Sequence, residues 1–199
     1  QAPPAWQGTP VQFTNISNSS GQVSYQWDLG NGFTSTDSSF SYTFGTPGFY
    51  DVTLVAVDSN NCSTTELARL EIYPNPIPNF ASTEACLNSS TQFTNQSYIN
   101  SGSSISAYIW NFGDQSNSNQ TNPNHTYAQV GTYNISLTAI SNYGCRETTV
   151  LQARVNPNPV AVFASSGSGC GPISSTFSES SSISEGVITG WLWNFSDGE

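Results

Sequence analysis

The chain has 199 residues, of which only 8% are charged, with no Lys, three Arg and a formal net charge of −10. Nucleic acids and anionic membrane surfaces bind clustered cations, so this composition excludes both as partners. Aromatic residues make up 13% of the chain. Since disordered segments are poor in aromatics, we expect a folded protein. No apolar stretch approaches the roughly 18 residues that a membrane-spanning helix needs, which argues against direct membrane insertion.

Short strands separated by turns are predicted along the whole chain. Apolar and polar residues alternate with period two, which is typical of strands that bury one face. Gly-Asn-Gly at residues 30–32 and Thr-Pro-Gly at residues 46–48 predict turns between them. No window has the spacing of an amphipathic helix. The predicted strands, in chain order, cover residues 11–14, 25–27, 50–57, 91–94, 108–110 and 133–140.

An internal repeat organises these strands. Trp27, Trp110 and Trp193 are equally spaced along the chain, and this spacing defines the repeat offset. Pro-Asn-Pro recurs at the same offset, at residues 74–76 and 157–159. Because proline fixes φ and favours an extended residue before it, we interpret the Pro-Asn-Pro segments as short, stiff linkers. The expected repeats are residues 1–75 with the first strand missing, residues 76–158 complete, and residues 159–199 truncated.

A six-residue motif begins at the tryptophan of each repeat. It reads Trp-Asp-Leu-Gly-Asn-Gly at residues 27–32, Trp-Asn-Phe-Gly-Asp-Gln at 110–115 and Trp-Asn-Phe-Ser-Asp-Gly at 193–198. Together with Pro-Asn-His-Thr-Tyr at 123–127 and Gly-Thr-Tyr-Asn-Ile-Ser-Leu at 131–137, the motif resembles the signature of polycystic-kidney-disease (PKD) repeats. The resemblance implies an all-β fold of tandem immunoglobulin-like β-sandwiches in an extracellular protein. The composition is similar in style to repeat arrays in giant surface proteins of Bacteroidetes-like bacteria.

Paired aromatic residues lie two positions apart on one predicted strand of each repeat, and therefore on one strand face. We interpret these pairs as sandwich core, where a buried Trp on the third strand is expected. A carbohydrate-binding platform is the alternative. The core residues predicted in this way are Tyr25, Trp27, Tyr108, Trp110, Trp191 and Trp193.

Acidic residues lie in the turn that follows each tryptophan, at Asp28, Asp114 and Asp197. Ca²⁺ takes roughly six to eight oxygen ligands, usually from several carboxylates, whereas each turn offers about one. Side chains that bond their own turn backbone explain these residues more simply. Ca²⁺ is therefore the alternative at these turns, and no other cofactor is expected.

Four cysteines indicate an oxidising compartment. Cys86 and Cys145 both fall in the second repeat, and a bond between them is the simplest disulfide, which leaves Cys62 and Cys170 without assigned partners. In an immunoglobulin-like topology the two loops can also lie at opposite ends, beyond the roughly 6 Å Cα separation that a disulfide allows. Bridges between neighbouring repeats and four free thiols are the alternatives.

A catalytic role is not expected for this chain. His125 is the only histidine, and the repeat aligns it with Tyr42, so a phenol can take the place of the imidazole. A catalytic dyad would also need a nucleophile and an orienting group beside His125. We therefore predict a non-catalytic protein in which His125 has a structural role.

A structural and adhesive role is the leading functional interpretation. In this reading the chain is a semi-rigid stalk or filament segment of a large cell-surface protein. Its partners are neighbouring repeats of the same polypeptide and a surface polysaccharide or protein. The first alternative is an accessory spacer or polymer-binding module of a secreted hydrolase, since fold alone does not determine function. A Ca²⁺-stiffened adhesin is the second alternative.

Overall fold

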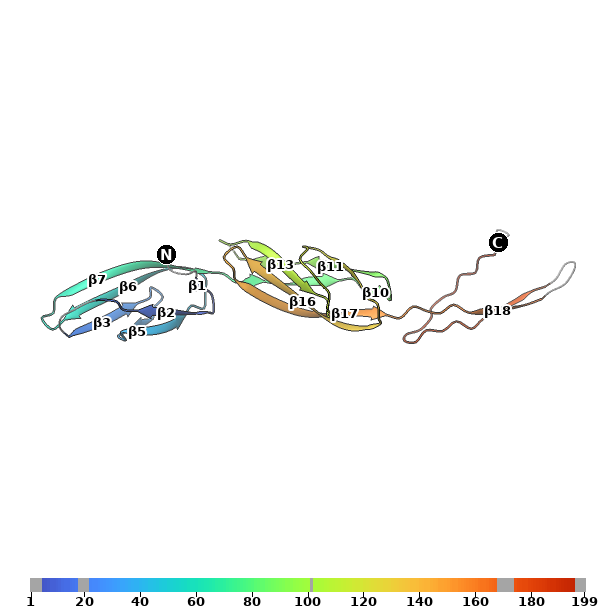
Figure 1. The fold of residues 1–199 in the computed structure, drawn as a ribbon, viewed down its shortest axis with the longest axis horizontal. Helices are drawn as coiled ribbons and strands as arrows, with labels where there is room; N and C mark the ends of the chain where they lie inside the picture. The colour runs from blue at the N-terminus through green and yellow to red at the C-terminus, as the bar shows by residue number, and fades with distance from the viewer. Residues whose placement is uncertain (1–4, 18–21, 101, 168–173, 196–199) are drawn as a thin grey trace. The chain divides into compact units, whose positions relative to one another are not determined.

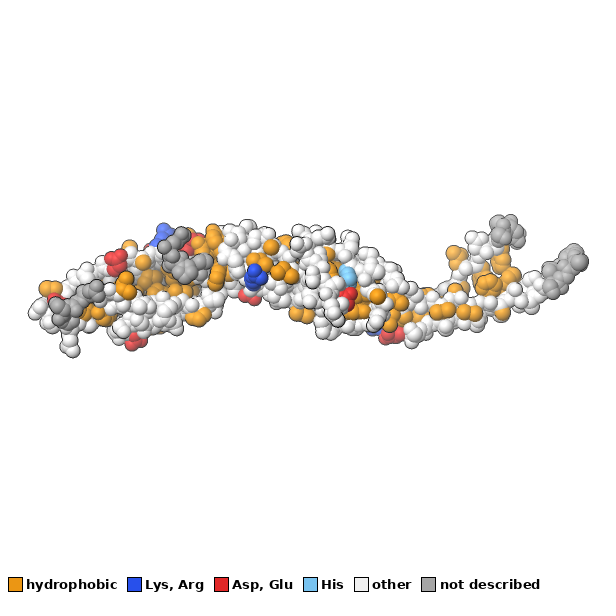
Figure 2. Space-filling view, in the orientation of Figure 1, with side chains coloured by type: hydrophobic (Ala, Val, Ile, Leu, Met, Phe, Trp, Pro, Cys, Tyr) orange, Lys and Arg blue, Asp and Glu red, His pale blue; other side chains and the backbone are white. Residues whose placement is uncertain are grey.

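The structure is a computed structural model that describes residues 5–17, 22–100, 102–167 and 174–195. Every regular element in this part of the chain is a β-strand, which confirms the predicted all-β class (Figure 1). No helix among the described residues is long and apolar enough to cross a membrane. Charged side chains are few and scattered on the face that Figure 2 shows, in keeping with the composition.

The first repeat is a sandwich of a five-stranded and a two-stranded sheet. Its strands are β1 (Ala5–Trp6), β2 (Pro10–Thr14), β3 (Val23–Asp28), β4 (Thr34–Ser35), β5 (Ser39–Thr43), β6 (Gly48–Asp58) and β7 (Ser63–Tyr73). The larger sheet has the order β1-β7-β6-β3-β4, and β2 pairs with β5 in the smaller one (Figure 1). Strands β6 and β7 form a long antiparallel hairpin in which Gly48 pairs with Ile72 and Val57 pairs with Ser63.

Aromatic rings fill the space between these two sheets. The alternation along β6 directs Val52 towards β2 and β5, where it joins Phe13, Trp27 and Phe44 in one buried cluster. The Phe13 and Trp27 rings meet edge to face with centroids 5.9 Å apart. This is a favourable geometry for aromatic pairs, so the predicted core role of Trp27 agrees with its packing.

The second repeat has the same plan with further strands. They are β8 (Pro76–Ile77), β9 (Phe80–Ser82), β10 (Ala85–Cys86), β11 (Ser90–Asn95), β12 (Tyr98–Ile99), β13 (Ile105–Asn111), β14 (Asn117–Ser118), β15 (Asn124–Thr126), β16 (Gly131–Ser141) and β17 (Arg146–Asn156). The larger sheet has the order β10-β17-β16-β13-β14, and the opposing one is three-stranded, β15-β11-β9. Strands β8 and β12 form a separate pair. Trp110 is fully buried, and Tyr108, like Tyr25 in the first repeat, is partly buried.

In the described part of residues 159–199, one antiparallel pair forms, β18 (Phe163–Ser166) with β19 (Thr176–Glu179). Trp191 and Trp193 are 53% and 38% exposed, so the prediction that they are buried core residues is wrong for this structure. The reason is that the described residues here form a single two-stranded sheet, which has no second sheet to cover the rings. Asp197 and Cys170 lie outside the described residues.

Candidate functional site

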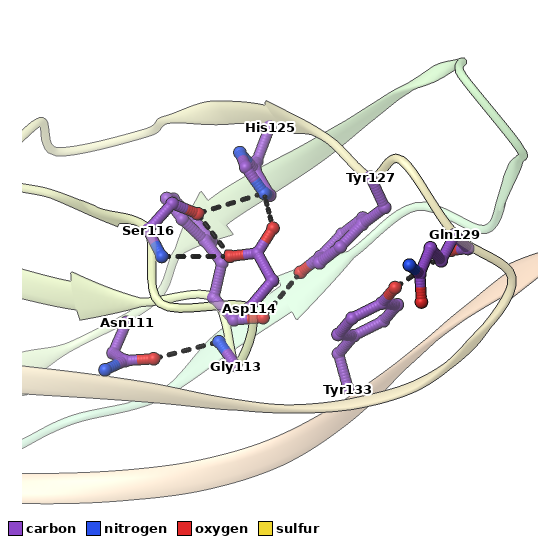
Figure 3. A network of polar contacts seen from close by, with 9 residues as sticks. Asn111, Gly113, Asp114, Ser116, His125, Tyr127, Gln129 and Tyr133 are labelled. Atoms are coloured by element: carbon purple, nitrogen blue, oxygen red, sulfur yellow. Dashed lines mark hydrogen bonds and ion pairs between the residues drawn. The ribbon is translucent and has the colours of Figure 1, made fainter.

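The turn that follows Trp110 is fixed by hydrogen bonds from its own backbone. Asn111 Oδ1 accepts the Gly113 N–H at 2.9 Å, and Asp114 Oδ1 accepts the Ser116 N–H at 3.1 Å (Figure 3). Gly113 and Gln115 have φ angles of +79° and +76°. Asn and Asp favour such turns because their side chains can bond a backbone N–H two residues further on.

His125, on β15, joins the neighbouring strand to this turn. Its ring stacks on Phe112 with centroids 4.4 Å apart and planes 9° apart. Its Nε2 lies 2.6 Å from Asp114 Oδ2 and 3.1 Å from Ser116 Oγ (Figure 3). The imidazole therefore packs as an aromatic ring and also connects β15 to the turn through polar contacts.

The electrostatic state of Asp114 follows from these contacts. Burial raises the pKa of its carboxyl, but hydrogen bonds from Ser116 and His125 outweigh burial and hold the pKa below its ordinary value. Burial also raises the pKa of the nearby Tyr127 phenol well above its usual range. The Tyr127 hydroxyl donates to the Phe112 carbonyl at 3.1 Å, so the phenol acts as a buried hydrogen-bond donor.

Ser116, His125 and Asp114 have the composition of a hydrolytic triad but not its geometry. In a triad the serine and the carboxylate contact different ring nitrogens, so that the carboxylate orients the base. Here both contact Nε2, and the Ser116 hydroxyl also donates to Asp114 Oδ1. A single ring nitrogen cannot donate to Asp114 and accept from Ser116 at the same time. The arrangement therefore braces the turn and does not activate a nucleophile.

We call the contact between Asp114 in the turn and His125 on β15 a brace, and the first repeat has an uncharged counterpart of it. At the repeat offset, Asn31 stands for Asp114 and Tyr42 stands for His125. Asn31 Nδ2 donates to the Tyr42 hydroxyl at 3.1 Å, which joins the turn to β5 in the same way. The sequence alignment of His125 with Tyr42 pointed to a structural role, but the contact with Asp114 was not predicted.

The Ca²⁺ candidates in the described residues are engaged by their own turns. Asp28 Oδ1 accepts the Gly30 N–H at 2.8 Å, and Asp114 bonds Ser116 and His125. Within the described ranges there is no group of three or more His, Cys, Asp and Glu side chains that could hold a metal ion. Asp28 and Asp114 thus each accept a hydrogen bond from the backbone of their own turn.

The cysteines of the second repeat lie at opposite ends of β17. Cys86 pairs with Asn156, the last residue of β17, whereas Cys145 directly precedes Arg146, the first one. At about 3.3 Å per residue, eleven strand residues separate them by about 35 Å, far beyond the reach of a disulfide. The predicted Cys86–Cys145 bond is therefore wrong for this fold. Cys62, Cys86 and Cys145 are free thiols, and burial raises the pKa of Cys145.

In both sandwiches that the structure describes, the strand that carries the tryptophan ends in a braced turn. These features define a class of immunoglobulin-like β-repeat. Comparison with known families is specific: a PKD domain matches residues 1–69 and a second PKD domain matches residues 73–155. The chain therefore belongs to the PKD domain family and contains two PKD domains in tandem. These domains are non-catalytic modules.

Relatives of known function match the PKD regions alone. Collagenase ColA of Bacillus cereus is 30% identical over 73 residues, which are 37% of this chain and 8% of the collagenase. The pre-pro-metalloprotease PrtV of Vibrio cholerae is 36% identical over 75 residues, which are 36% of this chain and 8% of the protease. The matched region thus spans less than a tenth of the length of each relative.

Solved structures of PKD domains are similar as well. The PKD1 domain of Vibrio anguillarum Epp is 27% identical, covers 42% of this chain and 96% of its own, and has a TM-score of 0.40. The PKD1 domain of the Vibrio cholerae metalloprotease PrtV is 27% identical, covers 41% of this chain and 96% of its own, and has a TM-score of 0.38.

Proposed function

We propose that the tandem PKD domains are a non-catalytic accessory module of a secreted, polymer-degrading hydrolase. The observation that carries this proposal is the nature of the relatives: a collagenase and a metalloprotease resemble the chain over one PKD-sized segment each. In such an enzyme the module holds an insoluble polymer near a catalytic domain elsewhere in the polypeptide. Secretion of this chain is part of the proposal.

The outer face of the first repeat's large sheet supplies a surface for such a polymer. Phe49 on β6 and Leu67 on β7 are 59% and 65% exposed. The Arg69 guanidinium lies 4.3 Å from the centroid of the Phe49 ring, where the cation and the ring face attract each other. In the strand register Glu71 lies opposite Phe49 and Asp51 lies opposite Arg69, so the exposed ring and the cation are accompanied by carboxylates, and the face suits a polymer that offers both apolar and polar groups.

Two measurements test the accessory role. The first is the domain composition of the full polypeptide, where a hydrolase domain supports the proposal and an array of repeats alone contradicts it. The second is cosedimentation of the 199-residue chain with insoluble collagen or chitin. We expect saturable retention on one polymer, reduced several-fold by Phe49→Ser. Val187→Ser, which also changes an exposed apolar side chain, is the control and keeps full retention.

A surface stalk is the second candidate function, and the repetition of the sequence favours it. The tryptophan motif occurs three times at the repeat offset, and Pro-Asn-Pro occurs twice at the same offset. We propose that residues 1–75, 76–158 and 159–199 are successive units of one array, whether the array spaces a catalytic domain or a cell-surface ligand. The composition of the full polypeptide distinguishes these two uses.

A further inference from the structure

The large sheet of the first repeat turns exposed apolar side chains and carboxylates away from the core on one face. Side chains alternate along a strand, so the neighbours of the core residues Trp27, Val52 and Ile72 point outwards. We call this surface the outer face. It includes Asp28 of β3, Phe49 and Asp51 of β6, and Leu67, Arg69 and Glu71 of β7.

The strand register brings an aromatic ring and two carboxylates together on the outer face. Phe49 lies opposite Glu71, and Asp51 follows Phe49 at the next outward position of β6. Side chains directly opposite each other have Cβ atoms about 5 Å apart, and diagonal neighbours are about 7–8 Å apart. One bound segment can therefore contact the Phe49 ring and both carboxylates at once.

The negative charge of the outer face is not balanced within the first repeat. Arg69 is the one basic residue among residues 1–75, and its guanidinium lies over the Phe49 ring. In the described ranges, no ion pair involves Asp51 or Glu71. The Glu71 carboxylate accepts a hydrogen bond from the Tyr73 hydroxyl at 2.9 Å, which is a neutral partner. The outer face is therefore complementary to a cationic ligand.

The second repeat shows that the fold does not require these carboxylates. The five strands of the two large sheets follow the same order, so their outward residues can be compared at the repeat offset. Asp51 corresponds to Asn134, and Glu71 corresponds to Arg154. Asn134 Oδ1 accepts a hydrogen bond from Gln152 Nε2 at 3.1 Å, which is a neutral pair where the first repeat has a carboxylate opposite an arginine. The acidic character belongs to the first repeat alone.

We propose that the outer face of the first repeat binds a basic polypeptide in extended conformation, with apolar residues beside its Lys or Arg side chains. The inference rests on the proposed accessory function, because it names the class of polymer that the module holds. An extended chain presents every second side chain to one face, about 6.7 Å apart, which matches the spacing of Phe49 and Asp51 along β6. The basic side chains contact the carboxylates, and the apolar ones contact Phe49 and Leu67. A neutral polysaccharide would gain no attraction from the carboxylates.

A synthetic peptide with the sequence Ser-Leu-Ser-Lys-Ser-Leu-Ser-Lys-Ser-Leu tests this proposal. Labelled with a fluorophore, it is titrated against the intact 199-residue chain at low ionic strength, and its anisotropy is followed. We expect saturable binding that weakens as salt is added, because salt screens exposed charges. The same peptide with Glu in place of Lys should not bind. The proposal is overturned if neither peptide binds or if both bind equally well.

Two double variants separate the outer face from the general acidity of the chain. Asp51→Asn with Glu71→Gln should weaken binding several-fold, since each exposed ion pair contributes little by itself. Asp37→Asn with Glu84→Gln removes the same charge from exposed positions in two loops, and should leave binding unchanged. Equal effects of the two double variants would mean that the peptide is attracted by net charge alone, which overturns the site.

Arg69→Gln gives a result of opposite sign. It introduces the residue that stands at this position in the second repeat and removes the cation from the outer face. Binding of the Lys peptide should become stronger by about twofold, because a repulsive exposed charge is lost. Weaker binding would contradict selection by charge.

Cosedimentation distinguishes failure of this proposal from failure of the accessory function. Retention on collagen or chitin that Phe49→Ser reduces, but Asp51→Asn with Glu71→Gln does not, supports the accessory module and overturns a basic polypeptide as its polymer. Peptide binding that the outer-face variants alter as expected supports the site. If the full polypeptide then contains repeats alone, the site stands and the accessory function is contradicted.

Discussion

Among the described residues, the first and second repeats place the same tryptophan against the same long hairpin, and in the second repeat β9 lies across one side of the core. In the described residues of the first repeat, the large sheet and the pair β2–β5 still bury Trp27 and Phe13 almost completely. The comparison therefore separates the part of a PKD domain that builds the core from the part that closes it. The hairpin and the braced turn build the core, and the additional strand closes it.

Truncation of Phe80, the β9 side chain that covers the core, is the strongest test of whether β9 closes the core. We expect Phe80→Ala to lower the free energy of unfolding of the second repeat by about 3 kcal/mol, because truncation of a buried Phe leaves a cavity. The repeat should still fold, since Phe93, Trp110 and Ile135 remain as a fully buried core between its two sheets. Calorimetry provides the unfolding energy, and quenching of Trp110 fluorescence by acrylamide reports the opened core.

Val150→Ala on β17 is the matched control for this change. Its side chain is well exposed, so its loss should alter the unfolding energy by no more than about 0.5 kcal/mol. If Phe80→Ala has an effect as small as this control, β9 does not close the core and the comparison between the repeats fails.

We expect the turn after the tryptophan to require glycine at the same position in both repeats. Gly30 and Gly113 have φ angles of +72° and +79°, and a Cβ at either position would lie under 3.0 Å from a backbone oxygen of β6 or β16. Left-handed backbone costs a non-glycine residue about 1–2 kcal/mol, and the close contact adds to this. We therefore expect Gly30→Ala and Gly113→Ala each to destabilise their own repeat by about 2 kcal/mol.

Gly45→Ala is the control for the glycine variants. Gly45 has no positive φ, and a Cβ there meets no atom within 4 Å, so the replacement should be nearly neutral. Thermal unfolding of the three variants measures the differences. A loss that is confined to one of the two turns would mean that the turns are not equivalent, contrary to the shared geometry.

Much of this architecture could be predicted from the sequence, because the same local pattern occurs in each repeat and each occurrence supports the interpretation of the others. The repeat offset, the alternation in β6 and β16, and the burial of Trp27 and Trp110 all follow from patterns in the chain. Burial of Trp191 and Trp193 could not follow from their motif alone, since a ring is buried only where a second sheet lies opposite it.

Contacts between distant residues were the part that sequence patterns did not reveal. The disulfide between Cys86 and Cys145 was inferred from their presence in one repeat, but the parallel pairing of β10 with the end of β17 separates them by the whole strand. The link between Asp114 and His125 depends on the fold of the turn against β15. Its one sequence signal was the shared offset that relates this pair to Asn31 and Tyr42.

The smallest expected effect concerns acid stability, where the charged brace differs from the uncharged one. Because the folded structure lowers the pKa of Asp114, its ionised form stabilises the second repeat fully above the unfolded pKa of about 4, and this contribution is lost as the pH falls through the lower folded pKa. Asp114→Asn should therefore cost about 1 kcal/mol at pH 7 and progressively less towards pH 3. Calorimetry across this range measures the difference from the unmodified chain, with Asp51→Asn, an exposed carboxylate on β6, as control. A cost that stays constant with pH would show that the charge of Asp114 does not contribute, and that the two braces are equivalent.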